Sequence, residues 1–74
     1  MKIYGYTKKN ANDLAEMSEV SFQGSSSQLV SIANFLLKYA EIMQKESHDF
    51  EHVHIKDECK DWDNSFPDII VNKQ

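Results

Sequence analysis

An apolar stretch with helical spacing behind Gly24 is the feature that most constrains the fold of this chain. Apolar side chains recur there at steps of three and four residues, at Leu29, Ile32, Ala33, Leu36, Ala40 and Met43. Ser25 is a good N-cap residue, and Gln28 follows at the spacing of a capping box. The pattern predicts an amphipathic helix over residues 26–46.

The apolar surface of this helix is broader than a single stripe. Five further apolar residues fall outside the stripe, namely Val30, Phe35, Leu37, Tyr39 and Ile42. Two interpretations follow from this breadth. Either the rest of the chain covers the helix on two sides, or the helix presents apolar surface to a partner.

Four short segments have the composition or alternation of β-strands. They are residues 2–6, 17–23, 51–55 and 68–72. In the second segment, for example, Val20 and Phe22 share one face. The order ββαββ predicts an α+β fold, a two-layer sandwich with the helix on one face of a four-stranded, largely antiparallel sheet. With 74 residues there is room for one small core, so residues 1–74 are expected to form a single domain.

Composition excludes several classes of function. The chain has no Arg and a net charge of −4, which argues against nucleic acid as a partner. No apolar run approaches the ~20 residues of a membrane-spanning helix, so no membrane partner is expected. A lone Cys59 allows no internal disulfide, and the N-terminus lacks the apolar core of a signal peptide. We therefore expect a cytoplasmic protein.

The negative charge is concentrated in one segment. Residues 46–68 hold eight acids and two lysines, a local balance of −6, and the two aromatics Trp62 and Phe66 lie within its polar part, residues 56–67. These aromatics either fold back as a lid on the core or anchor a protein contact with the acids as its rim. The charge favours a basic protein partner. The predicted partner-binding residues are Asp57, Glu58, Asp61, Trp62, Asp63 and Phe66.

His52 and His54 are the strongest candidates for metal ligands. Residues two apart on a strand point the same way, and such a pair can chelate Zn²⁺. Further ligands would have to come from residues without a recognised spacing, which are His48, Asp49, Asp57, Glu58 and Cys59. Two alternatives remain open, ordinary polar side chains or a pH-sensitive contact. The acidic neighbours of Cys59 disfavour a reactive thiolate, and no catalytic motif is present, so we expect a non-enzyme without a cofactor.

Several segments of the chain resemble small bacterial immunity proteins encoded beside polymorphic toxins. The resemblance spans residues 17–72 and is carried by residues 19–25, 29–36, 51–55, Asp57 and residues 67–71. It implies a cytoplasmic, non-enzymatic protein that neutralises a cognate toxin.

Two other functions are compatible with the sequence. One is a small metal-binding domain or metalloenzyme that uses His52 and His54. The other is a homo-oligomeric structural protein, or a homodimer, that associates through the open face of the sheet. The residues expected on that face are Tyr4, Tyr6, His52, His54 and Ile70.

Overall fold

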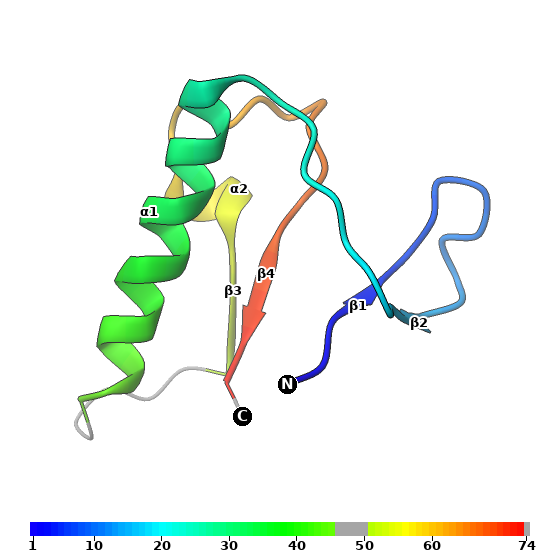
Figure 1. Ribbon diagram of the computed structural model, residues 1–74, viewed down its shortest axis with the longest axis horizontal. Helices are drawn as coiled ribbons and strands as arrows, with labels where there is room; N and C mark the ends of the chain where they lie inside the picture. The colour runs from blue at the N-terminus through cyan, green and yellow to red at the C-terminus, as the bar shows by residue number, and fades with distance from the viewer. Residues whose placement is uncertain (46–50, 74) are drawn as a thin grey trace.

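The computed structural model describes residues 1–45 and 51–73 (Figure 1). Its elements, in chain order, are β1 (Tyr4–Gly5), β2 (Ala15–Glu16), α1 (Ser26–Met43), β3 (His52–His54), α2 (Ile55–Glu58) and β4 (Ile70–Asn72). The predicted last residue of the helix, Glu46, and two candidate metal ligands, His48 and Asp49, lie outside the described residues.

The capping box confirms the predicted start of the helix α1. The backbone N–H of Gln28 donates to Ser25 Oγ at 3.2 Å, and the Ser25 N–H donates to Gln28 Oε1 at 2.8 Å. A Cβ at position 24 would lie 2.6 Å from that Gln28 oxygen, so the contact favours glycine there. The helix extends for 18 residues and ends at Met43.

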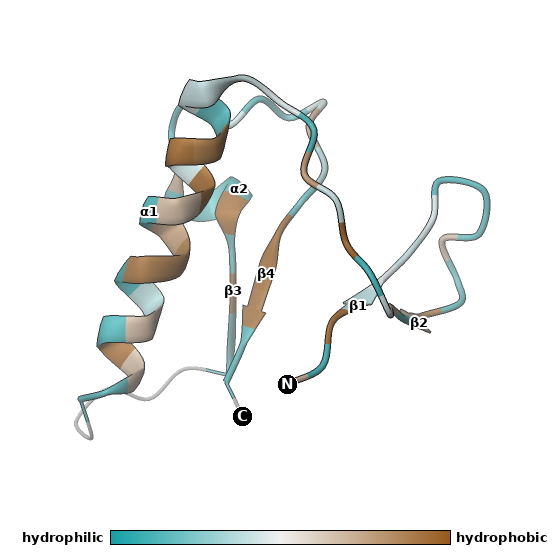
Figure 2. Ribbon diagram, in the orientation of Figure 1, coloured by the Kyte–Doolittle hydropathy of each residue, from teal (hydrophilic) through white to brown (hydrophobic). Residues whose placement is uncertain are grey.

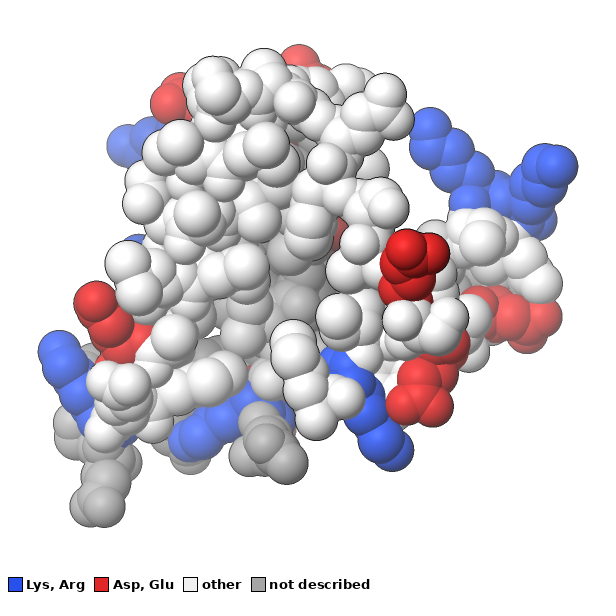
Figure 3. All heavy atoms as spheres, viewed as in Figure 1, with Lys and Arg blue, Asp and Glu red and all other residues white. Residues whose placement is uncertain are grey.

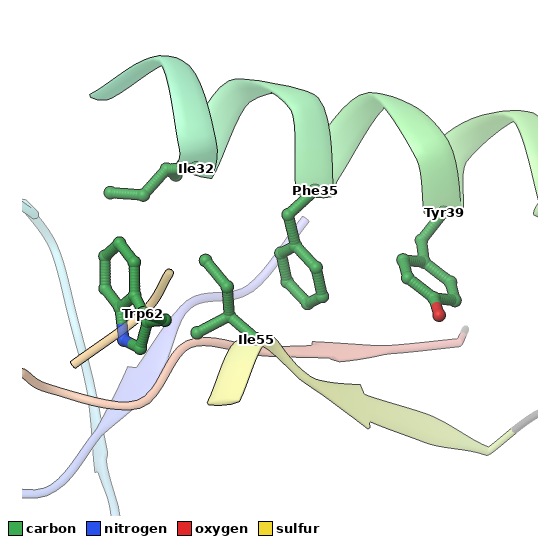
Figure 4. Close-up of a cluster of buried hydrophobic side chains, with 5 residues drawn as sticks. All are labelled: Ile32, Phe35, Tyr39, Ile55 and Trp62. Atoms are coloured by element: carbon green, nitrogen blue, oxygen red, sulfur yellow. The ribbon is translucent and has the colours of Figure 1, made fainter. Parts of the chain in front are cut away.

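The core is small and is built around α1 and α2. Its buried side chains are Ile32, Phe35, Tyr39, Ile55 and Trp62 (Figure 4). The side chains of Ile32, Phe35 and Tyr39 extend from α1 toward two residues, Ile55, which is fully buried, and Trp62. Because Ile55 and Trp62 come from α2 and the loop after it, that part of the chain is fixed to the helix by core packing.

The face of α1 that is buried differs from the predicted stripe. Ile32 is buried as expected, but Leu29 and Leu36 are exposed, and the buried face passes instead through Phe35 and Tyr39. These large aromatics fill the space above Ile55, and the predicted stripe lies beside them on the flank of the helix. Apolar surface along α1 is therefore left open (Figure 2).

The prediction of one four-stranded sheet is wrong. The strands form two separate two-stranded antiparallel sheets, β1 with β2 and β3 with β4 (Figure 1). In the second sheet Val53 lies opposite Val71, and both pack against the core, so this sheet turns one face toward α1. Each of the four strands is only two or three residues long, and β1 and β4 do not pair.

The predicted strand over residues 17–23 is also wrong. Its place is taken by β2, and the pairing with β1 ends where the Met17 N–H donates to the Ile3 carbonyl at 2.7 Å. Beyond this bond the backbone has no ladder partner, and Val20 and Phe22 are exposed. An alternating pattern indicates a strand only where a second strand pairs with it.

One further difference concerns the C-terminal half. The predicted strand over residues 51–55 ends at His54, and Ile55 instead begins the short helix α2. Within residues 1–45 and 51–73, no helix is both long and apolar enough to cross a bilayer.

Candidate functional site

The acidic segment predicted to bind a partner consists of α2 and the loop that follows it. Successive backbone bonds fold this segment into turns, from Cys59 N–H to the Ile55 carbonyl at 2.9 Å and from Trp62 N–H to the Cys59 carbonyl at 3.1 Å. A third bond joins the Phe66 N–H to the Asp63 carbonyl at 3.0 Å. These turns fix the positions from which the acids extend.

Both aromatic residues of the loop point toward the core. Trp62 is buried, and its Nε1–H donates to the Pro67 carbonyl at 3.0 Å. Phe66 is half-buried, with its ring centroid 5.3 Å from that of Trp62 in an edge-to-face arrangement. The structure thus brings them together in the lid arrangement. Their contact with a partner stays a prediction.

The predicted acids are exposed around these aromatics. Asp57, Asp61 and Asp63 all face solvent. Asp63 Oδ1 accepts hydrogen bonds from both the backbone N–H and the hydroxyl of Ser65, each at 2.7 Å. These bonds, the backbone one first, lower the pKa of Asp63. Its carboxylate is therefore both ionised at neutral pH and fixed in direction.

Glu58 links the acidic segment to α1. Its carboxylate accepts a hydrogen bond from the Tyr39 hydroxyl and lies 3.5 Å from Lys38 Nζ. The bond from Tyr39 is the main cause that lowers the pKa of Glu58, with a smaller contribution from Lys38. Burial, and then the bond to Glu58, raises the pKa of Tyr39 to about 12. Sequence spacing gave no indication of this pair.

The two histidines of β3 lie on the sheet face opposite to α1. Their ring centroids are 5.1 Å apart, and His54 Nδ1 is 2.6 Å from Asp68 Oδ2. Burial alone would raise the pKa of Asp68, but hydrogen bonds from His54 and the Lys56 N–H lower it below its usual value. Among the described residues, no three metal-ligating side chains gather at one place. Zinc binding by His52 and His54 stays a prediction.

The open sheet face predicted for self-association does not exist as one surface. Tyr4 belongs to β1, His52 and His54 belong to β3, and Ile70 belongs to β4, so these residues are divided between two sheets. Tyr6 lies just beyond β1. Tyr4, Tyr6 and Ile70 nevertheless come to one surface, because Tyr4 and Ile70 line a hollow whose continuation Tyr6 also lines.

That hollow is a feature that the sequence did not locate. It lies between the N-terminal segment, α1, β4 and the loop after α2, and Trp62 and Phe66 of that loop line it. Its volume is about 590 Å³, and it continues into a second region that reaches Leu36 and Met43 of α1. We call it the apolar groove and define it by Tyr4, Val20, Phe22, Leu29, Leu36 and Ile70. Figure 3 shows an uncharged surface over α1, with most charged side chains at its margins. The unusual breadth of apolar surface on the helix was the one sequence signal that pointed to it.

Comparison with known protein families gives a match over most of the chain. A family model described as Immunity protein 32 matches residues 19–74, which is more than half of the chain. The match includes α1, β3, α2 and β4 and leaves β1 and β2 outside it. No curated protein and no solved structure matches the chain.

Proposed function

The chain belongs to the Immunity protein 32 family, and from this premise we propose that it neutralises a cognate toxin through the acidic segment. Membership confirms the family resemblance of the sequence and implies a toxin protein as the partner. We call the proposed contact region the acidic surface and define it by Asp57, Glu58, Asp61 and Asp63, with Trp62 and Phe66 supporting it.

One observation carries the choice of this surface. Its four carboxylates are exposed on a segment that core packing and turn hydrogen bonds hold in place. Lys38 is the one lysine within ion-pair distance of these acids in the described part of the chain, at Glu58. Most of the negative charge of the acidic surface is therefore available to attract a partner.

Neutralisation of this kind requires binding and no chemical step. An acidic surface attracts a basic toxin, raises the rate of encounter and covers the cationic groups that the toxin would use. The acidic segment is already ordered by Trp62 and by the Asp63–Ser65 turn. Binding therefore loses little conformational entropy, which favours a tight complex.

A pair of charge reversals tests this surface in cells. We expect the Asp57→Lys, Asp61→Lys variant to lose protection against the toxin encoded beside the chain. These two acids are chosen because neither takes part in the turn that Asp63 makes with Ser65. The matched control is Glu16→Lys with Glu19→Lys, which changes the net charge by the same amount on an exposed segment outside the acidic surface.

The readout is growth when each variant is produced together with the toxin. The proposal predicts growth arrest with the first variant and normal growth with the control. Circular dichroism of both purified variants establishes that the helix is retained. Equal protection by the two folded variants would contradict the assignment of the acidic surface.

A further inference from the structure

The apolar groove leaves large apolar side chains in contact with solvent. Val20 is 46% exposed, Phe22 is 52% exposed and Leu36 is 42% exposed. No side chain in residues 1–31 is buried, so the N-terminal wall of the groove adds nothing to the core. Removing the exposed part of these side chains from water is favourable, and the single chain does not obtain this stabilisation.

The single chain also exposes more surface than its mass requires. Its accessible surface is 6560 Å², whereas a folded monomer of 8.6 kDa exposes about 4,700 Å². The excess of about 1,900 Å² exceeds the roughly 800 Å² that each partner buries in a standard interface. A Cα radius of gyration of 13.2 Å, against about 11 Å for a compact chain of this length, agrees with this excess.

The charges around the groove favour a second copy over a basic toxin. Within the described part of the chain, none of the four carboxylates of the acidic surface lines the groove. Its margin instead carries Lys2, Lys8 and Lys56, which would repel a basic protein. The one acid there, Asp68, already pairs with His54. By contrast, the exposed flank of α1 on a second copy, with Leu29 and Leu36, is apolar and meets no such repulsion.

We propose that two copies of this chain form a two-fold symmetric dimer through the apolar groove. Each copy places the flank of α1 that carries Leu36 against the groove of the other. An isologous interface of this kind uses the same surface on both copies. Here the flank of α1 that carries Leu36 and the apolar groove that receives it lie on one face of the chain. The four carboxylates of the acidic surface lie outside the groove, while Trp62 and Phe66, which support them, form part of its wall. The dimer therefore presents these carboxylates twice. This inference does not depend on the proposed function.

Analytical ultracentrifugation of the full chain tests the dimer. We expect the wild type to sediment at twice the 8.6 kDa mass of the chain at micromolar concentration. Leu36→Lys places a charge in the interface and should give a monomer. Leu37→Lys is the matched control, because Leu37 is the adjacent leucine of α1, is exposed, and does not line the groove. It should remain dimeric.

A second measurement applies even if Leu36→Lys does not fold. The melting temperature of a wild-type dimer rises with protein concentration, whereas that of a monomer does not change. A wild type that is monomeric at high micromolar concentration, with a melting temperature independent of concentration, would overturn the proposal. So would equal loss of the dimer in folded Leu36→Lys and Leu37→Lys variants.

Discussion

The Tyr39 hydroxyl joins the core to the acidic surface. It is buried on α1 and donates to Glu58 on α2. Tyr39→Phe should reduce the free energy of unfolding by about 1 kcal/mol, because one hydrogen bond to a charged acceptor is lost. It should also raise the pKa of Glu58. Urea denaturation and carboxyl NMR titration measure the two effects, with Tyr4→Phe on the exposed strand β1 as the control.

Asp68 makes the stability of the β3–β4 sheet dependent on pH. Its pKa is lower in the folded chain than in the unfolded one, so its carboxylate stabilises the fold above the unfolded value and loses this effect as the pH falls through the folded value. Asp68→Asn should therefore be less stable at neutral pH and should lose less stability than the wild type on acidification below about pH 4. Equal acid sensitivity of the two proteins in denaturation experiments would contradict this account.

Hydrogen bonds between residues close together in the sequence were predictable, whereas those between residues far apart in the sequence were not. The bonds between Ser25 and Gln28 follow from a spacing of three. The pair of His54 and Asp68 joins positions 14 residues apart, and no local pattern indicates it. The sequence alone shows that the acidic surface is negatively charged. It does not show that Tyr39 connects this surface to the core, because that contact depends on how α1 packs against α2.

At the scale of elements, α1 depends on its capping box. Ser25→Ala removes the acceptor for the Gln28 N–H and should reduce the free energy of unfolding by about 1 kcal/mol. Ser26→Ala, one residue into the helix, keeps this bond and is the control. Thermal unfolding followed by circular dichroism measures both. A cap variant as stable as the control would show that tertiary packing alone fixes the start of α1.

The periodicity of apolar residues located the main helix but did not indicate which of its faces is buried or which strands pair. Spacing located α1 correctly, but the face that is buried was decided by Ile55 and Trp62, which approach from α2 and its loop. Composition and alternation predicted strands of five to seven residues. The structure keeps two or three residues of the predicted strands 2–6, 51–55 and 68–72, where a partner pairs with them, and none of residues 17–23. The apolar groove lies where β1 and β4 do not pair, and no local sequence pattern indicates that these two strands stay apart.

At the scale of the whole molecule, two surfaces of different chemistry respond to salt in opposite ways. The proposed encounter with a basic toxin at the acidic surface should become slower as salt screens the charges. Association through the apolar groove brings together two chains of net charge −4, so screening should leave it unchanged or strengthen it. Sedimentation at low and high salt should therefore show a dimer that persists, and a dimer that dissociates as salt rises would contradict the apolar interface.

The rate at which the chain associates with its toxin reports whether the acidic surface is the site of capture. Stopped-flow mixing of the chain with its cognate toxin, over a range of salt concentrations, gives this rate. We predict that Asp57→Lys with Asp61→Lys lowers the association rate at low salt by about tenfold or more and flattens its salt dependence. The Glu16→Lys, Glu19→Lys control should keep a rate close to that of the wild type. If both variants associate at the wild-type rate with the wild-type salt dependence, the acidic surface is not the site of capture.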